Sequence, residues 1–126
     1  MSCERIAGND YVPIRLLFDG APHAVEDVVI EIKTPDAEGK FEGDFFDLDG
    51  TKLEDRLIEG RCVRVGEIDE ISYTRQHADG KTTTHYTGRV ILLQGTTTVM
   101  IRGTFTRETS GSATTLGGDH ETEKPT

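Results

Sequence analysis

The feature that most limits the fold of this sequence is a succession of strand-like runs separated by short turns. Segments rich in Val, Ile, Thr, Phe and Tyr alternate with glycine-containing turns about every 10–15 residues. β-branched and aromatic residues favour extended backbone, and closely spaced turns favour antiparallel neighbours. The expected strands are 11–18, 24–34, 40–48, 56–65, 68–78, 81–93 and 96–107. The pattern therefore predicts an all-β chain.

One segment carries a helical signal instead. Thr51-Lys52-Leu53-Glu54 has the form of a capping box, followed by Leu57 and ended by Gly60. It predicts one helical turn over 52–57, with a plain loop as the alternative.

Three short turns predict how the last four strands pair. Asp79-Gly80 places Tyr73 opposite Tyr86, Ile71 opposite Gly88 and Glu70 opposite Arg89. Gln94-Gly95 places Val90 opposite Val99, Gly88 opposite Ile101, Tyr86 opposite Gly103 and Thr84 opposite Phe105. Gly66-Glu67 places Cys62 opposite Ile71, Gly60 opposite Tyr73, Ile58 opposite Arg75 and Arg64 opposite Asp69. Because the three registers agree on the faces, an antiparallel meander is expected over 56–107.

The two faces of this meander differ in chemistry. The inner face is expected to carry Ile58, Cys62, Ile71, Tyr73, Tyr86, Val90, Val99, Ile101 and Phe105. The outer face is expected to carry Arg61, Arg64, Asp69, Glu70, Thr87, Arg89 and Arg102, with ion pairs Arg64–Asp69 and Glu70–Arg89. Opposite charges across neighbouring strands stabilise a sheet modestly.

A short pattern, apolar-x-Gly-x-apolar, recurs on the inner face. It spans Phe41–Phe45, Ile58–Cys62, Tyr86–Val90 and Ile101–Phe105. A mid-strand glycine lets the strand bend and leaves room for a large neighbour, and close approach to a ligand is the alternative. Over about residues 40–107 the repeat resembles the avidin-like and lipocalin-like calycin barrels. The resemblance implies a closed barrel with a cavity at one mouth. It does not imply a biotin site, because the tryptophans of an avidin pocket have no counterpart in a chain without Trp.

The predicted fold is a small antiparallel up-and-down meander barrel, calycin-like, of about seven or eight strands, with a bent β-sandwich as the alternative. Inward residues of two N-terminal strands would close it: Val12, Ile14, Leu16, Phe18, Val28, Ile30 and Ile32. Residues 1–10 are expected to be flexible and 11–108 to form the barrel domain. Residues 109–126, rich in Ser, Thr, Gly and charge, are expected to be a disordered tail.

Composition excludes several partners. The 126 residues include 23 acidic and 14 basic side chains, for a net charge of -9. Such a balance argues against binding to nucleic acid or to an anionic membrane surface, and no apolar run is long enough to span a bilayer. The N-terminus lacks the apolar stretch of a signal peptide. We therefore expect a cytoplasmic protein with Cys3 and Cys62 reduced.

The sequence motifs that could indicate a metal site or covalent catalysis lack the required residues or spacing. Residues 45–51 resemble the nucleophile motif of haloacid-dehalogenase phosphatases, but the antiparallel chain that follows lacks the required Asp pair. Asp44, Asp47 and Asp49 do not fit calcium-loop spacing. His77 is expected on the inner face and His85 on the outer, so they cannot share a metal. We expect no metal, no cofactor and no catalytic set.

A polar patch on the inner face, at one end of the meander, is the candidate ligand site. Its residues are Arg75, His77, Tyr73, Tyr86, Thr84 and Arg107. Guanidinium groups beside aromatic rings suit a small anionic or amphipathic ligand held in the barrel mouth. The simpler alternative is that strand ends meet solvent there.

Two other functions stay open. One is a non-catalytic interaction or oligomerisation module, a homo-oligomer formed through Val29, Ile91, Leu93 or Met100. The other, ranked last, is a calycin-like barrel enzyme using the tyrosines, Arg75 or His77 for acid–base or oxyanion chemistry.

Overall fold

The computed structural model describes residues 2–8, 11–12, 14–18, 28–93, 95, 98–113 and 115–124. Gln94 of the expected Gln94-Gly95 turn and the start of the expected 24–34 strand lie outside the described residues. The elements are a 3-10 helix, η1 (Ser2–Ile6), and nine strands: β1 (Arg15–Phe18), β2 (Val29–Ile32), β3 (Lys40–Phe41), β4 (Gly43–Phe46), β5 (Lys52–Val65), β6 (Ile68–Gln76), β7 (Thr82–Leu92), β8 (Val99–Thr109) and β9 (Leu116–Lys124). No described helix has the length and apolar character needed to cross a membrane.

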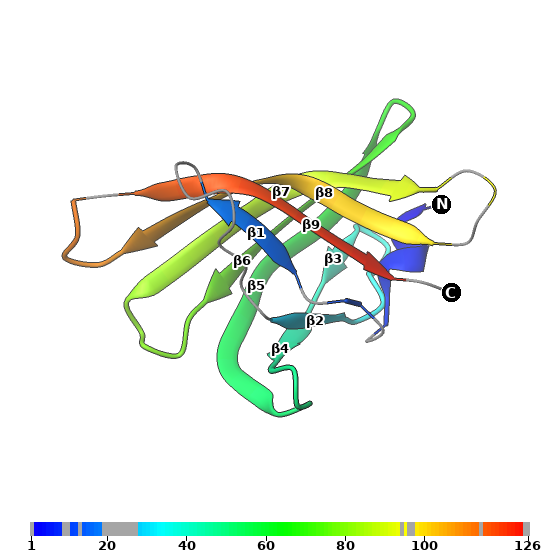
Figure 1. Cartoon of the computed structure of the whole chain (residues 1–126). Coiled ribbons are helices and arrows are strands. Elements are labelled where there is room, and N and C mark those ends of the chain that lie inside the picture. The colour runs from blue at the N-terminus through cyan, green and yellow to red at the C-terminus, as the bar shows by residue number, and fades with distance from the viewer. Residues whose placement is uncertain are drawn as a thin grey trace.

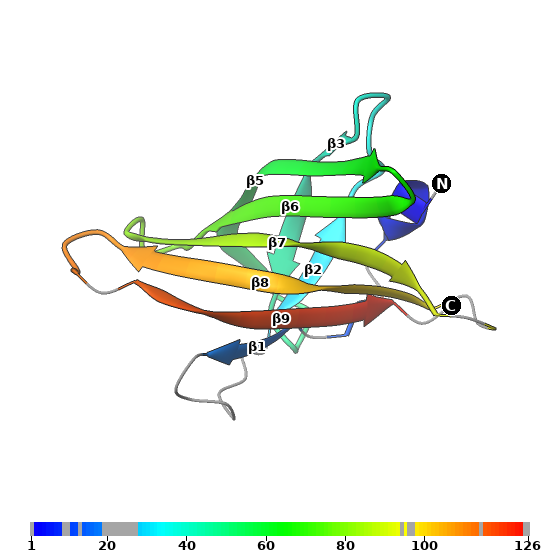
Figure 2. The ribbon, with the colours of Figure 1, turned by 90° about the horizontal axis from the view of Figure 1, so that it is seen from above.

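The strands form one antiparallel sheet that curls into a barrel (Figures 1 and 2). Its order is β1-β9-β8-β7-β6-β5-β4-β2, and the short β3 also pairs with β5. A bridge between Ile14 and Val28, with Ile14 N donating to Val28 O at 2.6 Å, joins the two edges of the sheet. Apart from the β1–β9 pair and the β4–β2 pair, which skips β3, neighbours in the sheet follow the order of the chain. The prediction of an all-β up-and-down barrel is confirmed.

The barrel interior is a continuous apolar core. Tyr73 and Tyr86 are stacked with ring centroids 4.6 Å apart, as their predicted cross-strand pairing requires. Phe105 continues the row beside Tyr86, and Phe18 meets Phe105 edge-on at 5.1 Å. Aromatic rings in this arrangement combine a large buried area with favourable ring–ring contact.

Helix η1 covers one end of the barrel, opposite the β6–β7 and β8–β9 turns (Figure 1). Ile6 is fully buried, and the Tyr11 hydroxyl donates to the Ile6 carbonyl. Cys3 forms a disulfide with Cys62 of β5, with the two Cα atoms 5.8 Å apart. The expected flexible N-terminus is therefore wrong for residues 2–8, and the expected reduced cysteines are wrong. The fold brings the two cysteines together across 59 residues of chain, a proximity that spacing alone does not reveal.

Strand β9 corrects the expected disordered tail. It lies between β8 and β1, and it pairs with β8 over Leu116–Lys124 and with β1 over Gly118–Glu121. Its sequence is polar and rich in glycine and shows no apolar alternation, because its inward positions are His120 and Thr122. These buried side chains are accommodated by hydrogen bonds, His120 to the Thr87 carbonyl and Thr122 to the Val12 carbonyl, each at 2.8 Å.

The β7–β8 register differs from the prediction by two residues. Gly88 lies opposite Gly103, Tyr86 opposite Phe105, and Val90 opposite Ile101. The hairpin is closed by Leu93 N donating to Thr98 O, so the connection is longer than two residues. A shift of two keeps every side chain on its expected face.

The β5–β6 pairing begins as predicted, with Cys62 opposite Ile71 and Arg64 opposite Asp69, and then breaks at a bulge. Glu59 in this bulge has φ 54°, a left-handed conformation. Beyond it the inward positions change, so Leu57 rather than Ile58 lies opposite Arg75. Residues 52–57 are extended as part of β5, and neither the helical turn nor the loop forms.

Asp69 is a further correction, because its side chain is buried rather than on the outer face. The predicted ion pair with Arg64 does not form between these two described residues. Arg64 instead donates from Nε to the Gly66 carbonyl.

Candidate functional site

Four of the predicted site residues meet at the end of the barrel that lies away from η1. Arg75 lies near the end of β6, Thr84 near the start of β7 and Arg107 near the end of β8. The register aligns these three directly, with Thr84 opposite both arginines. His77 follows β6 and contacts Thr84. We call Asp55, Arg75, His77, Thr84 and Arg107 the mouth cluster.

Asp55 is the member of the mouth cluster that the sequence analysis missed. Its Oδ2 lies 2.5 Å from Nε of Arg75, and both side chains are more than nine-tenths buried. Its Oδ1 accepts a hydrogen bond from the backbone N–H of Ala78 at 3.0 Å. Arg75 therefore has an acidic partner on the inner face. The β5 bulge is the reason, because it turns Asp55 inward where an unbroken register would have pointed Arg56.

The other half of the mouth cluster is a chain of hydrogen bonds centred on Thr84. Arg107 donates from Nε to Thr84 Oγ1 at 2.8 Å, and His77 Nε2 lies 2.8 Å from the same oxygen. Because Arg107 can only donate, the Thr84 hydroxyl is free to donate to His77 Nε2. That assignment puts the proton of a neutral His77 on Nδ1, which faces Asp55 Oδ2 at 4.0 Å.

This Asp–His–Thr order resembles a nucleophile triad, but its geometry serves another purpose. Thr84 has no exposed surface, and 4.0 Å between His77 and Asp55 exceeds hydrogen-bond distance. Arg107 also occupies the Thr84 oxygen that would attack a substrate. The arrangement holds the side chains of the mouth in place.

Aromatic rings support both arginines of the mouth cluster. The guanidinium carbon of Arg75 lies 5.3 Å from the centre of the Phe45 ring, and that of Arg107 lies 5.4 Å from Phe18. Such contacts favour a cation over a ring face. With Asp55 as its one carboxylate, the cluster carries more positive than negative charge in a chain of net charge -9.

The two predicted site tyrosines lie deeper in the barrel. Tyr73 and Tyr86 are both almost fully buried, and burial raises the pKa of Tyr73 well above its usual value. The Tyr73 hydroxyl has no hydrogen-bond partner among the described residues. A buried polar atom in this state usually faces a water molecule or a ligand.

His120 of β9 is a second interior residue that the sequence analysis missed. Its ring packs edge-on against Tyr86 at 5.3 Å, and Nε2 donates to the Thr87 carbonyl. Nδ1 is buried and has no partner within the described part of the chain. Burial is the main cause that lowers the pKa of His120. His120 lies opposite Gly103 of β8, and no local pattern of the sequence signals this pairing.

The acidic turn residues that the sequence analysis considered for calcium have structural roles. Asp47 and Asp49 accept hydrogen bonds from the backbone of their own turn, and Asp44 pairs with Lys52 at 3.4 Å. The residues named for self-association, Val29, Ile91, Leu93 and Met100, are half-buried. The more exposed large apolar side chains are Val12, Leu48, Val65, Ile68, Leu92 and Leu116.

Comparison with solved structures supports the fold, whereas comparison of the sequence assigns the chain to no family. No protein-family model matches the chain, and no curated protein matches it in sequence. Among solved structures, a biotin-binding protein from chicken is similar with a TM-score of 0.64 and 17% identity, covering 98% of this chain and 99% of that one. Apo shwanavidin has a TM-score of 0.58 and 12% identity over 94% and 95% of the two chains. A low-affinity mutant of shwanavidin has a TM-score of 0.61 and 12% identity over 95% and 96%. The chain therefore has the avidin-like β-barrel fold over nearly its whole length.

Proposed function

We propose that this chain binds a small ligand with an anionic group at the end of the barrel away from η1. The observation that carries the proposal is the mouth cluster, in which two inward arginines flank Thr84 and Asp55 pairs with Arg75. Arg107 is the more exposed of the two arginines, so we place the anionic group of the ligand beside Arg107. Its guanidinium is half-buried and braced by Thr84 and Phe18, and a braced guanidinium binds an oxyanion with little loss of side-chain entropy.

The interior behind Arg107 supports a ligand with a second polar end. Tyr73 Oη and His120 Nδ1 are buried polar atoms without a partner among the described residues. Burying a polar atom without a hydrogen bond costs free energy, and a ligand that hydrogen-bonds to either atom offsets that cost. Tyr73, Tyr86 and His77 complete the proposed contacts. The chicken relative binds biotin, a small molecule that carries a carboxylate, which agrees with a small ligand here, although the absence of Trp argues for a different one.

Native mass spectrometry of freshly purified protein is the first test. It reports a retained small molecule and the number of chains in the particle together, so it also tests the proposed homo-oligomer. A thermal-shift panel of small carboxylates, biotin included, then follows. We expect at least one carboxylate to stabilise the protein, with less stabilisation as salt concentration rises.

Arg107→Gln is the variant that localises the site. It should abolish the carboxylate-dependent shift while leaving Asp55 and Arg75 paired. Arg64→Gln is the matched control, because it removes the same charge from an exposed position. If native mass spectrometry finds no bound small molecule and no carboxylate of the panel raises the melting temperature, the mouth cluster is excluded as a ligand site and the interaction module is favoured.

The proposed location also changes. The cytoplasmic expectation came from the N-terminus and included reduced cysteines, whereas Cys3 and Cys62 form a disulfide and disulfides persist in oxidising compartments. We therefore place the protein in an oxidising compartment as part of this proposal. Alkylation of intact cells followed by mass measurement tests it, since a modified Cys3 or Cys62 would support the cytoplasm.

A further inference from the structure

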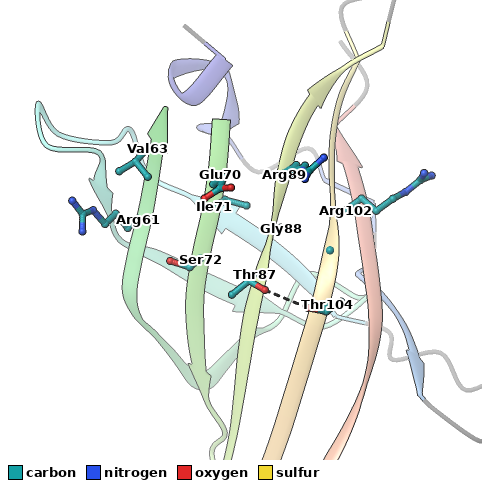
Figure 3. Close-up of a pocket in the computed structure, with 11 residues that line it drawn as sticks. Arg61, Val63, Glu70, Ile71, Ser72, Thr87, Gly88, Arg89, Arg102 and Thr104 are labelled. Carbon is teal, nitrogen blue, oxygen red and sulfur yellow. Dashed lines mark hydrogen bonds between the residues drawn. The ribbon is translucent and has the colours of Figure 1, made fainter. Parts of the chain in front are cut away.

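The outer face of the barrel has a hollow of its own, of about 390 Å³, over β5 to β8 (Figure 3). It lies on the side of the sheet opposite the mouth cluster. The registers build it from three neighbouring rows of residues. Its floor is the backbone of Ile71, Gly88 and Gly103, whose positions face inward. One wall is the row Arg61, Ser72, Thr87 and Thr104, and the other is Val63, Glu70, Arg89 and Arg102.

The facing glycines give the hollow its floor. Gly88 and Gly103 approach so closely that a Cβ added to Gly103 would lie 2.4 Å from the Gly88 Cα. Because the floor residues face inward, the side chains of the two walls form the rim. Within one wall the Thr87 and Thr104 hydroxyls lie 3.3 Å apart, and Ser72 lies beside Thr87 in register.

The charges around the hollow are unbalanced. Arg61 and Arg89 have no ion-pair partner among the described residues, and Arg102 contacts Glu121 at 3.4 Å. Arg89 and Arg102 lie directly opposite each other on adjacent strands. Like charges in this position destabilise a sheet. Glu70 is the one carboxylate among the rim residues, so the rim carries a net positive charge in an acidic chain.

We propose that this hollow is a second binding site, separate from the mouth, for a tetrahedral oxyanion such as a phosphate or sulfate group. Guanidinium groups match such anions in shape and charge, and hydroxyl groups supply further donors to the same oxygens. An anion over the glycine floor relieves the repulsion between Arg89 and Arg102 and gives Arg61 a partner. The group comes either from the free anion or from an ester on a larger molecule, because both present the same oxygens to the rim.

Titration with inorganic phosphate and with inorganic sulfate, followed by amide chemical shifts in NMR at low ionic strength, tests the site. We expect the largest shifts at Thr87, Gly88, Gly103 and Thr104. Arg89→Gln should weaken binding about tenfold, and Arg89→Lys should weaken it less because it keeps the charge. Glucose 6-phosphate distinguishes the free anion from a phosphate ester. An affinity equal to that of inorganic phosphate indicates that the anion alone is recognised, and a tighter affinity indicates an ester. Both results support the site.

Two control variants separate this site from the mouth. Arg64→Gln removes an exposed positive charge from the same strand as Arg61, and Arg107→Gln removes the mouth arginine. Both should leave the affinity for phosphate within about twofold, which is the change expected from net charge alone. If Arg107→Gln abolishes phosphate binding and Arg89→Gln does not, the anion belongs to the mouth and the outer site is excluded.

Three other results would overturn the proposal. One is no phosphate or sulfate binding at low ionic strength. Another is shifts spread over all basic surfaces with no dependence on Arg89, which means an adventitious ion only. The third is a dimer in analytical ultracentrifugation that dissociates in Arg89→Gln while the monomer binds no anion, because a second copy of the chain would then occupy this face.

Discussion

Asp55 and Arg75 form an ion pair of 2.5 Å at the end of the barrel away from η1, where both side chains are almost fully buried. A β-bulge at Glu59 makes this contact possible, because it shifts the register of the first half of β5 by one residue and so turns Asp55 inward. The pair fixes the position of Arg75, and the Ala78 amide that Asp55 also binds ties the β6–β7 turn to β5. This end of the barrel is thus organised by a carboxylate in a segment that was expected to be a helical turn or a loop and is instead part of β5.

Replacing Asp55 with Asn should destabilise the protein by about 3–5 kcal/mol, since it leaves a buried guanidinium without its counter-ion. Urea unfolding of Asp55→Asn measures the loss of free energy. Glu54→Gln makes the same chemical change at the neighbouring exposed residue and should cost less than about 0.5 kcal/mol. Equal, small effects of the two substitutions would mean that the ion pair does not hold the mouth together.

The strand pattern and the turns predicted the barrel because both are local properties of the sequence. Asp79-Gly80 lies at the centre of the β6–β7 connection, which a hydrogen bond from His77 N to Thr82 O closes, so it predicted the Tyr73–Tyr86 pairing correctly. In the next hairpin Leu93 N donates to Thr98 O, two residues beyond the partner that a Gln94-Gly95 turn would give, so the register there is off by two. The bulge at Glu59 is not visible in the pattern, so the analysis found Arg75 and Thr84 but not Asp55. Contacts that depend on a bulge need the three-dimensional pairing to be known.

Gly103→Ala should destabilise the barrel by more than about 3 kcal/mol or prevent folding. An added Cβ would lie 1.9 Å from the Thr87 carbonyl oxygen and 2.4 Å from the Gly88 Cα, and backbone atoms cannot move aside. The sequence had suggested Tyr86 as the neighbour of Gly103, but the obstacle is the facing strand. Thermal melts of Gly103→Ala and of the outward control Thr104→Ala make the comparison. A loss below about 1 kcal/mol for both would show that the strands are not this close.

His120 should make the stability of the protein depend on pH. Its pKa is lowered by burial below the ordinary 6.5, so the folded state keeps the ring neutral. Below pH 6.5 the unfolded chain binds a proton that the folded chain does not, and the free energy of unfolding therefore falls as pH falls. Urea unfolding at pH 7.5 and pH 5 should show a smaller decrease for His120→Gln than for the wild-type protein. His85→Gln, at an exposed site, is the control and should behave as the wild type does. Identical decreases in all three proteins would contradict the prediction.

Strand β9 explains why the interior was only partly predictable. Leu116–Lys124 has little apolar alternation, and its pairing partners β8 and β1 stabilise it through backbone hydrogen bonds and closure of the barrel. Composition describes such a segment as disordered because it counts apolar side chains and not the sheet edges that need covering. A chain truncated after Thr115 should therefore fail to fold, as circular dichroism would report. A truncated protein with the full melting temperature would restore the disordered-tail interpretation.

Reduction of the Cys3–Cys62 disulfide should lower the free energy of unfolding by about 4 kcal/mol, from the loop-closure entropy of the 59-residue separation. The loss should be accompanied by release of η1, because the disulfide joins that helix to β5. Urea unfolding with and without dithiothreitol measures the first effect, and hydrogen exchange at Ile6 measures the second. The double variant Cys3→Ser, Cys62→Ser should match the reduced protein and ignore dithiothreitol. If the reduced protein keeps both its stability and the protection of Ile6, packing of η1 against the barrel is sufficient and the disulfide is dispensable.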